Sequence, residues 1–114
     1  ELNRIDKSIR GLSSAVATVS VSGGINRPPL ELSSTKELYE KFEKVAKDLG
    51  VAPVGHASVG GASDGNLAAA AGAKVLDGLG AVGIGAHAPT ESIKISTVEP
   101  RIKLINAFIN ELLK

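Results

Sequence analysis

The glycine-rich stretch from Asp77 to Glu91 constrains the fold more than any other part of the chain. Its sequence is DGLGAVGIGAHAPTE, with glycine at positions 78, 80, 83 and 85 and a histidine, His87, two residues before a proline. Glycine permits backbone conformations with positive φ and lets other atoms approach the main chain closely, at a cost in conformational entropy. The spacing is incompatible with a regular helix or an ordinary strand. It predicts a loop whose backbone lies close to another group.

The histidine of this loop has two interpretations. An imidazole on a loop can be a metal ligand or a catalytic group. A loop histidine that is hydrogen-bonded to nearby backbone fits the pattern equally well, and one histidine does not decide between the two. The other histidine, His56, has no acidic residue within several positions, and we interpret it as structural.

Composition narrows the class of protein. With 114 residues, 43% of them hydrophobic, the chain fits one domain or a part of a larger one. The net charge is +1 and the basic residues are dispersed, so the sequence has no basic patch of the kind that binds nucleic acid. Aromatic residues make up 3%, too few for side chains on which bases could stack. Cysteine is absent, which excludes thiolate chemistry and fits a reducing compartment; we expect the cytoplasm.

Two further absences bear on the context of the chain. No apolar run approaches the roughly 20 residues needed to span a bilayer, so no membrane contact is expected. Methionine is absent throughout the sequence, and we therefore expect these residues to be an excerpt of a longer protein.

The first part of the chain predicts a helix followed by a strand. Leu2, Ile5 and Ile9 recur at helical spacing in residues 2–12, with Asn3 available as a cap and a glycine near the end. Residues 15–22 alternate between two faces, as a strand with one wet side does. A single helix and strand cannot bury both faces, so we expect the end of a small sheet-and-helix layer.

A rigid crossing follows at residues 24–29, GINRPP. The residue before a proline avoids the helical region, so this segment is expected to be extended. Arg27 in such a segment can bind a carboxylate with its two-pronged guanidinium group. A solvated linker arginine is the alternative, and the segment alone leaves both open.

The central part predicts helices and a possible anion site. Residues 34–37 have capping-box spacing ahead of an apolar stripe that ends before Gly50, with a turn expected at Pro53 and Gly55. In residues 59–66, VGGASDGN, glycines precede a short helix at 67–71, which would present backbone N–H groups to an anion. Alternatively this is a strand-to-helix turn capped by Ser63 or Asp64.

The last part predicts short buried strands at 75–76 and 93–95 on either side of the glycine-rich stretch. A second capping-box spacing, at residues 96–99, precedes a long amphipathic helix. From about residue 30 onward the alternation of helices and strands predicts a three-layer α/β unit.

Four features in order resemble the carboxy-terminal portion of the M20 metallopeptidases, the relatives of glutamate carboxypeptidase, acetylornithine deacetylase and succinyl-diaminopimelate desuccinylase. They are INRPPLE at 25–31, GGASDGN at 60–66, LDGLGAVGIGAHAPTE at 76–91 and the closing helix. The resemblance covers essentially the whole chain. It implies a zinc-dependent hydrolase, with two zinc ions per active site, that cleaves an amide bond beside a free carboxylate of a peptide or N-acyl amino acid.

The resemblance also implies roles for individual residues. The histidine of the GAH motif, here His87, ligates one metal, and Glu91 lies close enough in sequence to support it. Arg27 matches the arginine that meets the substrate carboxylate. The remaining matches lie in the glycine-rich loop. Gly60, Gly61 and Ser63 match the pocket lining, and Asp64 matches an acid for which we expect a bracing role.

The resemblance assigns the chain to two partial domains. Residues 1–24 match the last helix and strand of a small α+β lid or dimerisation domain, and residues 25–114 match the carboxy-terminal part of the catalytic domain. The other zinc ligands and the general base lie in an amino-terminal half that has no match here. We therefore expect an inactive fragment whose parent is a homodimer. The alternative hypothesis is a free-standing α/β module that binds anions without catalysis.

Overall fold

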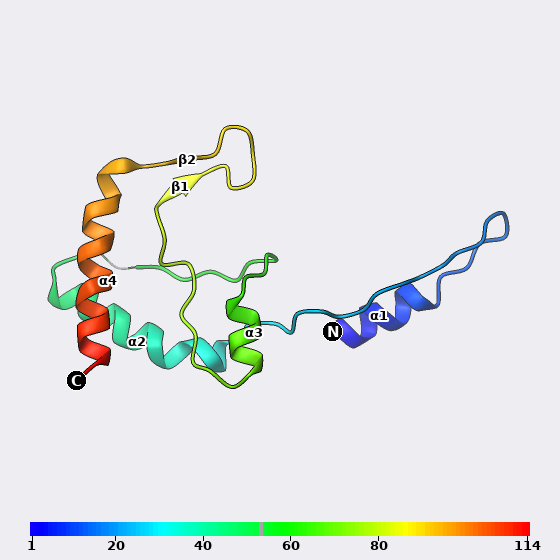
Figure 1. The fold of residues 1–114 in the computed structure, drawn as a ribbon, viewed down its shortest axis with the longest axis horizontal. Coiled ribbons are helices and arrows are strands. Elements are labelled where there is room, and N and C mark those ends of the chain that lie inside the picture. The colour runs from blue at the N-terminus through cyan, green and yellow to red at the C-terminus, as the bar shows by residue number, and fades with distance from the viewer. Residues whose placement is uncertain (53) are drawn as a thin grey trace.

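The computed structural model describes residues 1–52 and 54–114. Pro53 lies outside the described residues, so the turn expected at Pro53 and Gly55 falls partly outside them. In chain order the elements are α1 (Leu2–Arg10), α2 (Leu32–Asp48), α3 (Gly65–Ala70), β1 (Gly83–Ile84), β2 (Ser92–Ile93), the 3₁₀-helix η1 (Ile95–Thr97) and α4 (Val98–Leu112) (Figure 1). None of the helices in the described ranges is both long and apolar enough to cross a membrane.

The core lies where α2 crosses α4. Phe42 and Phe108 meet edge to face, with ring centroids 5.2 Å apart and an interplanar angle of 87°. Ala46 and Leu104 complete this buried cluster. Each helix contributes a pair of residues four positions apart, which lie on one face. Five partly buried residues pack around the cluster: Leu38, Val45, Val54, Leu76 and Leu79.

The first quarter of the chain projects away from this core (Figure 1). Helix α1 begins after Glu1, so Asn3 is not its cap, contrary to the sequence prediction. The guanidinium of Arg10 donates to the carbonyl oxygen of Gly23 at 2.6 Å and holds the returning chain against the helix. The molecule measures 62 × 36 × 18 Å with a radius of gyration of 19.2 Å. A compact chain of this length would have a radius of about 13 Å.

The strand predicted at residues 15–22 is wrong. These residues form no ladder with any described segment, residues 15–17 form a bend, and Val16 is 95% exposed. A strand needs a neighbouring strand to pair its N–H and C=O groups, and alternation of side chains cannot supply one.

The strand predicted at 75–76 is also wrong. The backbone N–H of Val75 donates to the carbonyl oxygen of Ser34 at 2.9 Å, so its partner is the first turn of α2 rather than another strand. Near residues 93–95, β2 ends at Ile93 and η1 begins at Ile95.

The sheet of the described residues is therefore small. Strands β1 and β2 are antiparallel, with Gly83 opposite Ile93 and Ile84 opposite Ser92. Helices combined with one small sheet are consistent with part of an α/β domain. The predicted three-layer organisation remains a prediction.

The capping box predicted at residues 34–37 lies inside the first turn of α2. Glu31 is the N-cap residue, and its side chain makes no cap hydrogen bond. Instead, the hydroxyl of Thr35 donates back to the carbonyl oxygen of Glu31 at 3.2 Å. Short hydroxyl side chains bond to backbone carbonyls one turn earlier as readily as they cap N–H groups, so spacing alone did not locate the helix start.

The same correction applies to α4. The helix begins at Val98 with Thr97 as its N-cap residue, whereas Ser96, the expected cap, lies within η1. The hydroxyl of Thr97 donates to the carbonyl oxygen of Lys94 at 2.6 Å. The amphipathic helix itself is confirmed.

The Leu104→Ala substitution should lower the free energy of unfolding by about 3 kcal/mol, because Leu104 is 2% exposed and its removal leaves a cavity between α2 and α4. The control Leu113→Ala makes the same chemical change on a side chain that is 79% exposed, and should cost less than about 0.5 kcal/mol. Urea denaturation followed by circular dichroism measures both. Equal losses would contradict the assigned core.

Candidate functional site

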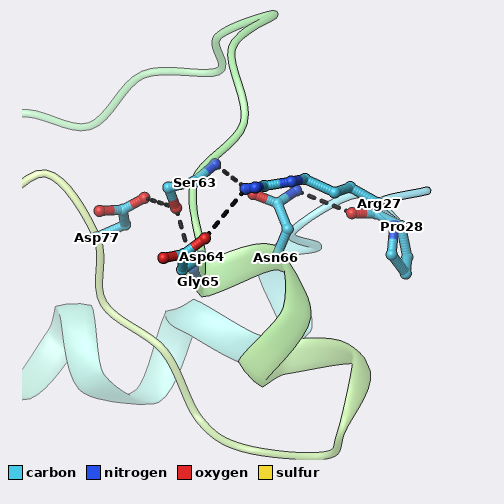
Figure 2. A network of polar contacts seen from close by, with 7 residues as sticks. All are labelled: Arg27, Pro28, Ser63, Asp64, Gly65, Asn66 and Asp77. Atoms are coloured by element: carbon cyan, nitrogen blue, oxygen red, sulfur yellow. Dashed lines mark hydrogen bonds and ion pairs between the residues drawn. The ribbon is translucent and has the colours of Figure 1, made fainter.

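The side chain of Asn66 joins two segments that are far apart in the sequence. Its amide nitrogen, Nδ2, donates to the carbonyl oxygen of Pro28 at 2.8 Å. Its amide oxygen, Oδ1, accepts from the backbone N–H of Ser63 at 3.0 Å. Asn66 is 9% exposed and is the buried polar residue of the described chain. The crossing at residues 24–29 is thereby tied to the loop that precedes α3 (Figure 2).

Arg27 reaches the same loop by an ion pair. Its Nη1 lies 3.3 Å from Oδ1 of Asp64, whose side chain is 94% exposed, whereas that of Arg27 is 37% exposed. An ion pair as open to water as this one contributes at most about 1 kcal/mol. A guanidinium group carries about five N–H donors in a planar fork. One contact with Asp64 therefore leaves other N–H groups of Arg27 that can donate to a carboxylate from solution.

Asp77 braces the loop from the other side. The hydroxyl of Ser63 donates to Oδ2 of Asp77, and the backbone N–H of Gly78 donates to Oδ1 at 2.7 Å. These two bonds, the one from Ser63 first, hold the pKa of the Asp77 carboxyl below its ordinary value. Gly65 leaves room for the contact, since a Cβ there would lie 3.1 Å from the hydroxyl oxygen of Ser63.

Asp77 was not among the residues singled out from the sequence. The available signal was an acid directly before the first glycine of DGLG, a position at which the side chain can bond to the next backbone N–H. That signal predicts a turn, and it carries no information about Ser63, which lies 14 residues earlier.

The start of α3 does not present the free N–H groups that an anion cradle at this helix end would need. The N–H of Ser63 is bonded to Asn66, and that of Gly65 to the hydroxyl oxygen of Ser63 at 3.1 Å. The N–H of Asn66 donates to the carbonyl oxygen of Ser63 at 3.2 Å. The alternative, a turn into a helix, is closer to the structure, although Asp64 is the N-cap residue and makes no cap bond.

Gly60 and Gly61 lie in an exposed part of the same loop. A Cβ added to either would meet no protein atom within 4 Å. No neighbour in the described structure therefore demands glycine there, and the pocket-lining role implied by the resemblance remains a prediction.

His87 lies in the loop that connects β1 to β2. The glycines before it serve the hairpin, because a Cβ on Gly83 would lie 2.2 Å from the carbonyl oxygen of Ser92 across the ladder. The sequence predicts a loop whose backbone lies close to another group. The neighbour that the structure shows is the opposite strand.

The backbone of His87 is in the left-handed region, with φ +65°, and its side chain is exposed. Such a conformation is uncommon for residues other than glycine, although histidine adopts it more readily than most. The N–H of His87 donates to Oε2 of Glu91 at 3.2 Å, so Glu91 braces the turn through the backbone of His87. The imidazole is thus presented at the surface by a defined turn.

The hairpin loop of His87 is separate, in the described structure, from Arg27 and the loop of Ser63 and Asp64. No hydrogen bond or ion pair within residues 1–52 and 54–114 joins His87 or Glu91 to Arg27, Ser63 or Asp64. These residues also contain no group of three or more His, Cys, Asp or Glu side chains that could hold a metal ion. Zinc needs three or four ligands, and His87 alone is one.

The contacts of His56 fit the structural interpretation. Its ring lies 5.2 Å from that of Tyr39 at 75°, and its Nδ1 is 3.4 Å from the tyrosine hydroxyl. That hydroxyl lies 2.6 Å from Oε1 of Glu43, and this bond raises the pKa of Tyr39.

The Ser63→Ala substitution should raise the pKa of Asp77 toward the ordinary aspartate value of about 3.9, because the carboxylate loses its strongest donor. A carboxyl whose folded-state pKa is depressed adds stability above the unfolded-state pKa, and this stability is lost as the pH falls through the folded-state value. The variant should therefore lose less stability on acidification. Titration of the Asp77 side-chain carbon by NMR measures the shift, and identical midpoints in both proteins would rule out the bond.

The comparison with known protein families bears on nearly the whole chain. The model of peptidase family M20/M25/M40 matches residues 7–111, a range that includes Arg27, the loop at 60–66 and the hairpin of His87. No curated protein and no solved structure matches the chain. The resemblance seen in the sequence is thereby confirmed at the level of the family, without a choice among its subfamilies. The chain belongs to peptidase family M20/M25/M40.

Proposed function

We propose that the chain is the carboxy-terminal part of a zinc-dependent exopeptidase or N-acyl-amino-acid deacylase that cleaves an amide bond next to a free carboxylate. Family membership supports hydrolysis of peptide-like bonds. The observation that carries the finer proposal is the placement of Arg27. Its guanidinium lies beside the loop of Ser63 and Asp64, in a segment that Asn66 fastens to the same loop.

In this proposal Arg27 binds the substrate carboxylate. The guanidinium is half-buried and its contact with Asp64 is weak, so a substrate carboxylate can compete for it. Gly60, Gly61 and Ser63 form the adjoining wall of the substrate pocket. Asp64 keeps the arginine side chain near that wall before substrate arrives.

His87 is the metal ligand that this chain contributes, supported through the backbone by Glu91. The other ligands and the general base belong to the amino-terminal half of the parent protein. A bound zinc ion would supply a Lewis acid that increases the acidity of a coordinated water. The role of this chain is to present one imidazole at a fixed position and to orient the substrate through its carboxylate.

The remaining parts of the proposal concern the parent protein. Residues 1–24 form the end of a lid or dimerisation domain, and the exposed apolar face of α1 suits packing against the rest of such a domain. Its half-exposed residues are Leu2, Ile5 and Ile9. The fragment alone is inactive because it lacks a full ligand set and a base, and the parent is a cytoplasmic homodimer.

The alternative, an anion-binding module without catalysis, depended on unpaired backbone N–H groups in residues 59–66. The amides of Ser63, Gly65 and Asn66 are all engaged within the loop. No specific observation therefore favours this alternative.

The His87→Asn substitution in the parent protein should lower zinc content and reduce hydrolysis by about a hundredfold or more, since even indirect support of a metal ligand is worth roughly 10- to 100-fold. Asparagine tolerates the left-handed backbone of this position, so the turn is kept while the imidazole is lost. Elemental analysis and turnover of N-acylated amino acids are the two measurements. His56→Asn is the matched control and should change neither. Full zinc content and activity in His87→Asn would remove the proposed role.

The Arg27→Lys substitution should raise KM for an N-acylated amino acid by about tenfold or more, with a smaller effect on kcat. Lysine keeps the charge but loses the fork that binds a carboxylate through two parallel bonds. Arg101→Lys, on α4, is the control. An unchanged KM in Arg27→Lys, or an equal rise in the control, would show that Arg27 does not bind the carboxylate.

A further inference from the structure

The buried amide of Asn66 has no role in the proposed chemistry, although it joins two of the segments that do. It bonds at 2.8 Å to Pro28, the residue directly after Arg27, and at 3.0 Å to Ser63, the serine of the glycine-rich loop. The partners of Asn66 are separated by 35 positions in the chain. Figure 2 shows the side chain lying between the Arg27 segment and the start of α3.

The chemistry of an asparagine amide suits this position. The group presents one acceptor and two donor hydrogens in a plane, and here the acceptor faces an N–H while the nitrogen faces a carbonyl oxygen. Aspartate has nearly the same shape but no donor for Pro28. Leucine has a similar size and neither group.

The other contact between the two segments cannot define their relative position equally well. The ion pair of Arg27 with Asp64 is 3.3 Å long and largely exposed, so it is weak and is screened by salt. A substrate carboxylate that binds Arg27 would also compete with Asp64 for it. Asn66 bonds to backbone atoms at both ends and does not depend on the state of the guanidinium.

We propose that Asn66 is a positioning residue for substrate recognition. It holds the Arg27 segment, residues 24–29, at a fixed place against the loop that contains Ser63, so that the guanidinium meets the substrate carboxylate. This inference rests on the proposed function of Arg27. It extends that function by naming the residue that sets the position of the carboxylate site relative to the loop.

The test compares Asn66→Leu, which loses both bonds, with Asn66→Asp, which keeps an acceptor for Ser63 and loses the donor to Pro28. Hydrogen exchange of the parent protein, followed by mass spectrometry, reports on the two bonds of Asn66, to Pro28 and to Ser63. Both variants should show faster exchange in peptides covering residues 24–31. Asn66→Asp alone should keep normal protection in residues 59–65. Peptides from α2 and α4 should be unchanged, which shows that the fold is intact.

The functional readout is recognition of a carboxylate. Both variants should raise KM for an N-acetylated amino acid by about tenfold, because a displaced Arg27 loses about one hydrogen bond to the charged substrate carboxylate. The change in kcat should be less than about threefold. The dissociation constant of N-acetylglutamate, measured by calorimetry, should rise by a similar factor. Asn110→Leu, on the exposed face of α4, is the matched control and should behave as the unmodified protein.

The outcomes separate this inference from the proposed function. Unchanged exchange at residues 24–31 in both variants, or loosened exchange with unchanged KM and unchanged binding, would overturn the role of Asn66. An unmodified parent that binds N-acetylglutamate but hydrolyses neither peptides nor N-acylated amino acids would refute the proposed function, and calorimetry alone would then decide on Asn66. An unmodified parent that does not bind the probe would overturn both.

Discussion

The edge-to-face contact between Phe42 and Phe108 fixes α2 against α4, and both parts of the candidate site depend on these two helices. The Arg27 segment leads directly into α2. In the first turn of α2, the carbonyl oxygen of Ser34 accepts a hydrogen bond from the N–H of Val75, two residues before Asp77. The hairpin of His87 leads through η1 into α4. Aromatic packing between two helices therefore sets where the Arg27 segment and the His87 loop emerge, although neither Phe42 nor Phe108 lies in them.

The two parts of the site share a construction. In each, a side chain able to bind a ligand stands on backbone that a neighbouring side chain holds: Asn66 bonds to the segment of half-buried Arg27, and Glu91 bonds to the N–H of exposed His87. Neither part is a metal site as it stands, because the described residues contain no group of three or more His, Cys, Asp or Glu side chains that could hold a metal ion. The large radius of gyration and the exposed apolar side chains of α1, β1 and β2 indicate surfaces that need other protein to cover them.

The sequence predicted the long helices because their apolar stripes are local, as at Phe42 and Leu104. It misplaced the helix starts, since Glu31 and Thr97 are the N-cap residues and not the serines of the two capping-box patterns, Ser34 and Ser96. It also predicted strands at 15–22 and 75–76, where pairing depends on partners that local alternation cannot reveal. Arg27, Ser63 and His87 were identified by family resemblance. Asn66 and Asp77 were missed because their bonds join segments remote in the chain. The amides of Ser63 and Gly65, which an anion cradle would leave free, are bonded to the side chains of Asn66 and Ser63.

The central claim is that this chain supplies one metal ligand, His87, to an active site completed by the amino-terminal half of the same protein. An anomalous diffraction map recorded at the zinc edge, from crystals of the parent enzyme, tests it most directly. The account predicts a zinc peak about 2.0–2.1 Å from one imidazole nitrogen of His87, with its remaining ligands contributed from outside residues 1–114. A fully ligated zinc site from which His87 is absent would contradict it.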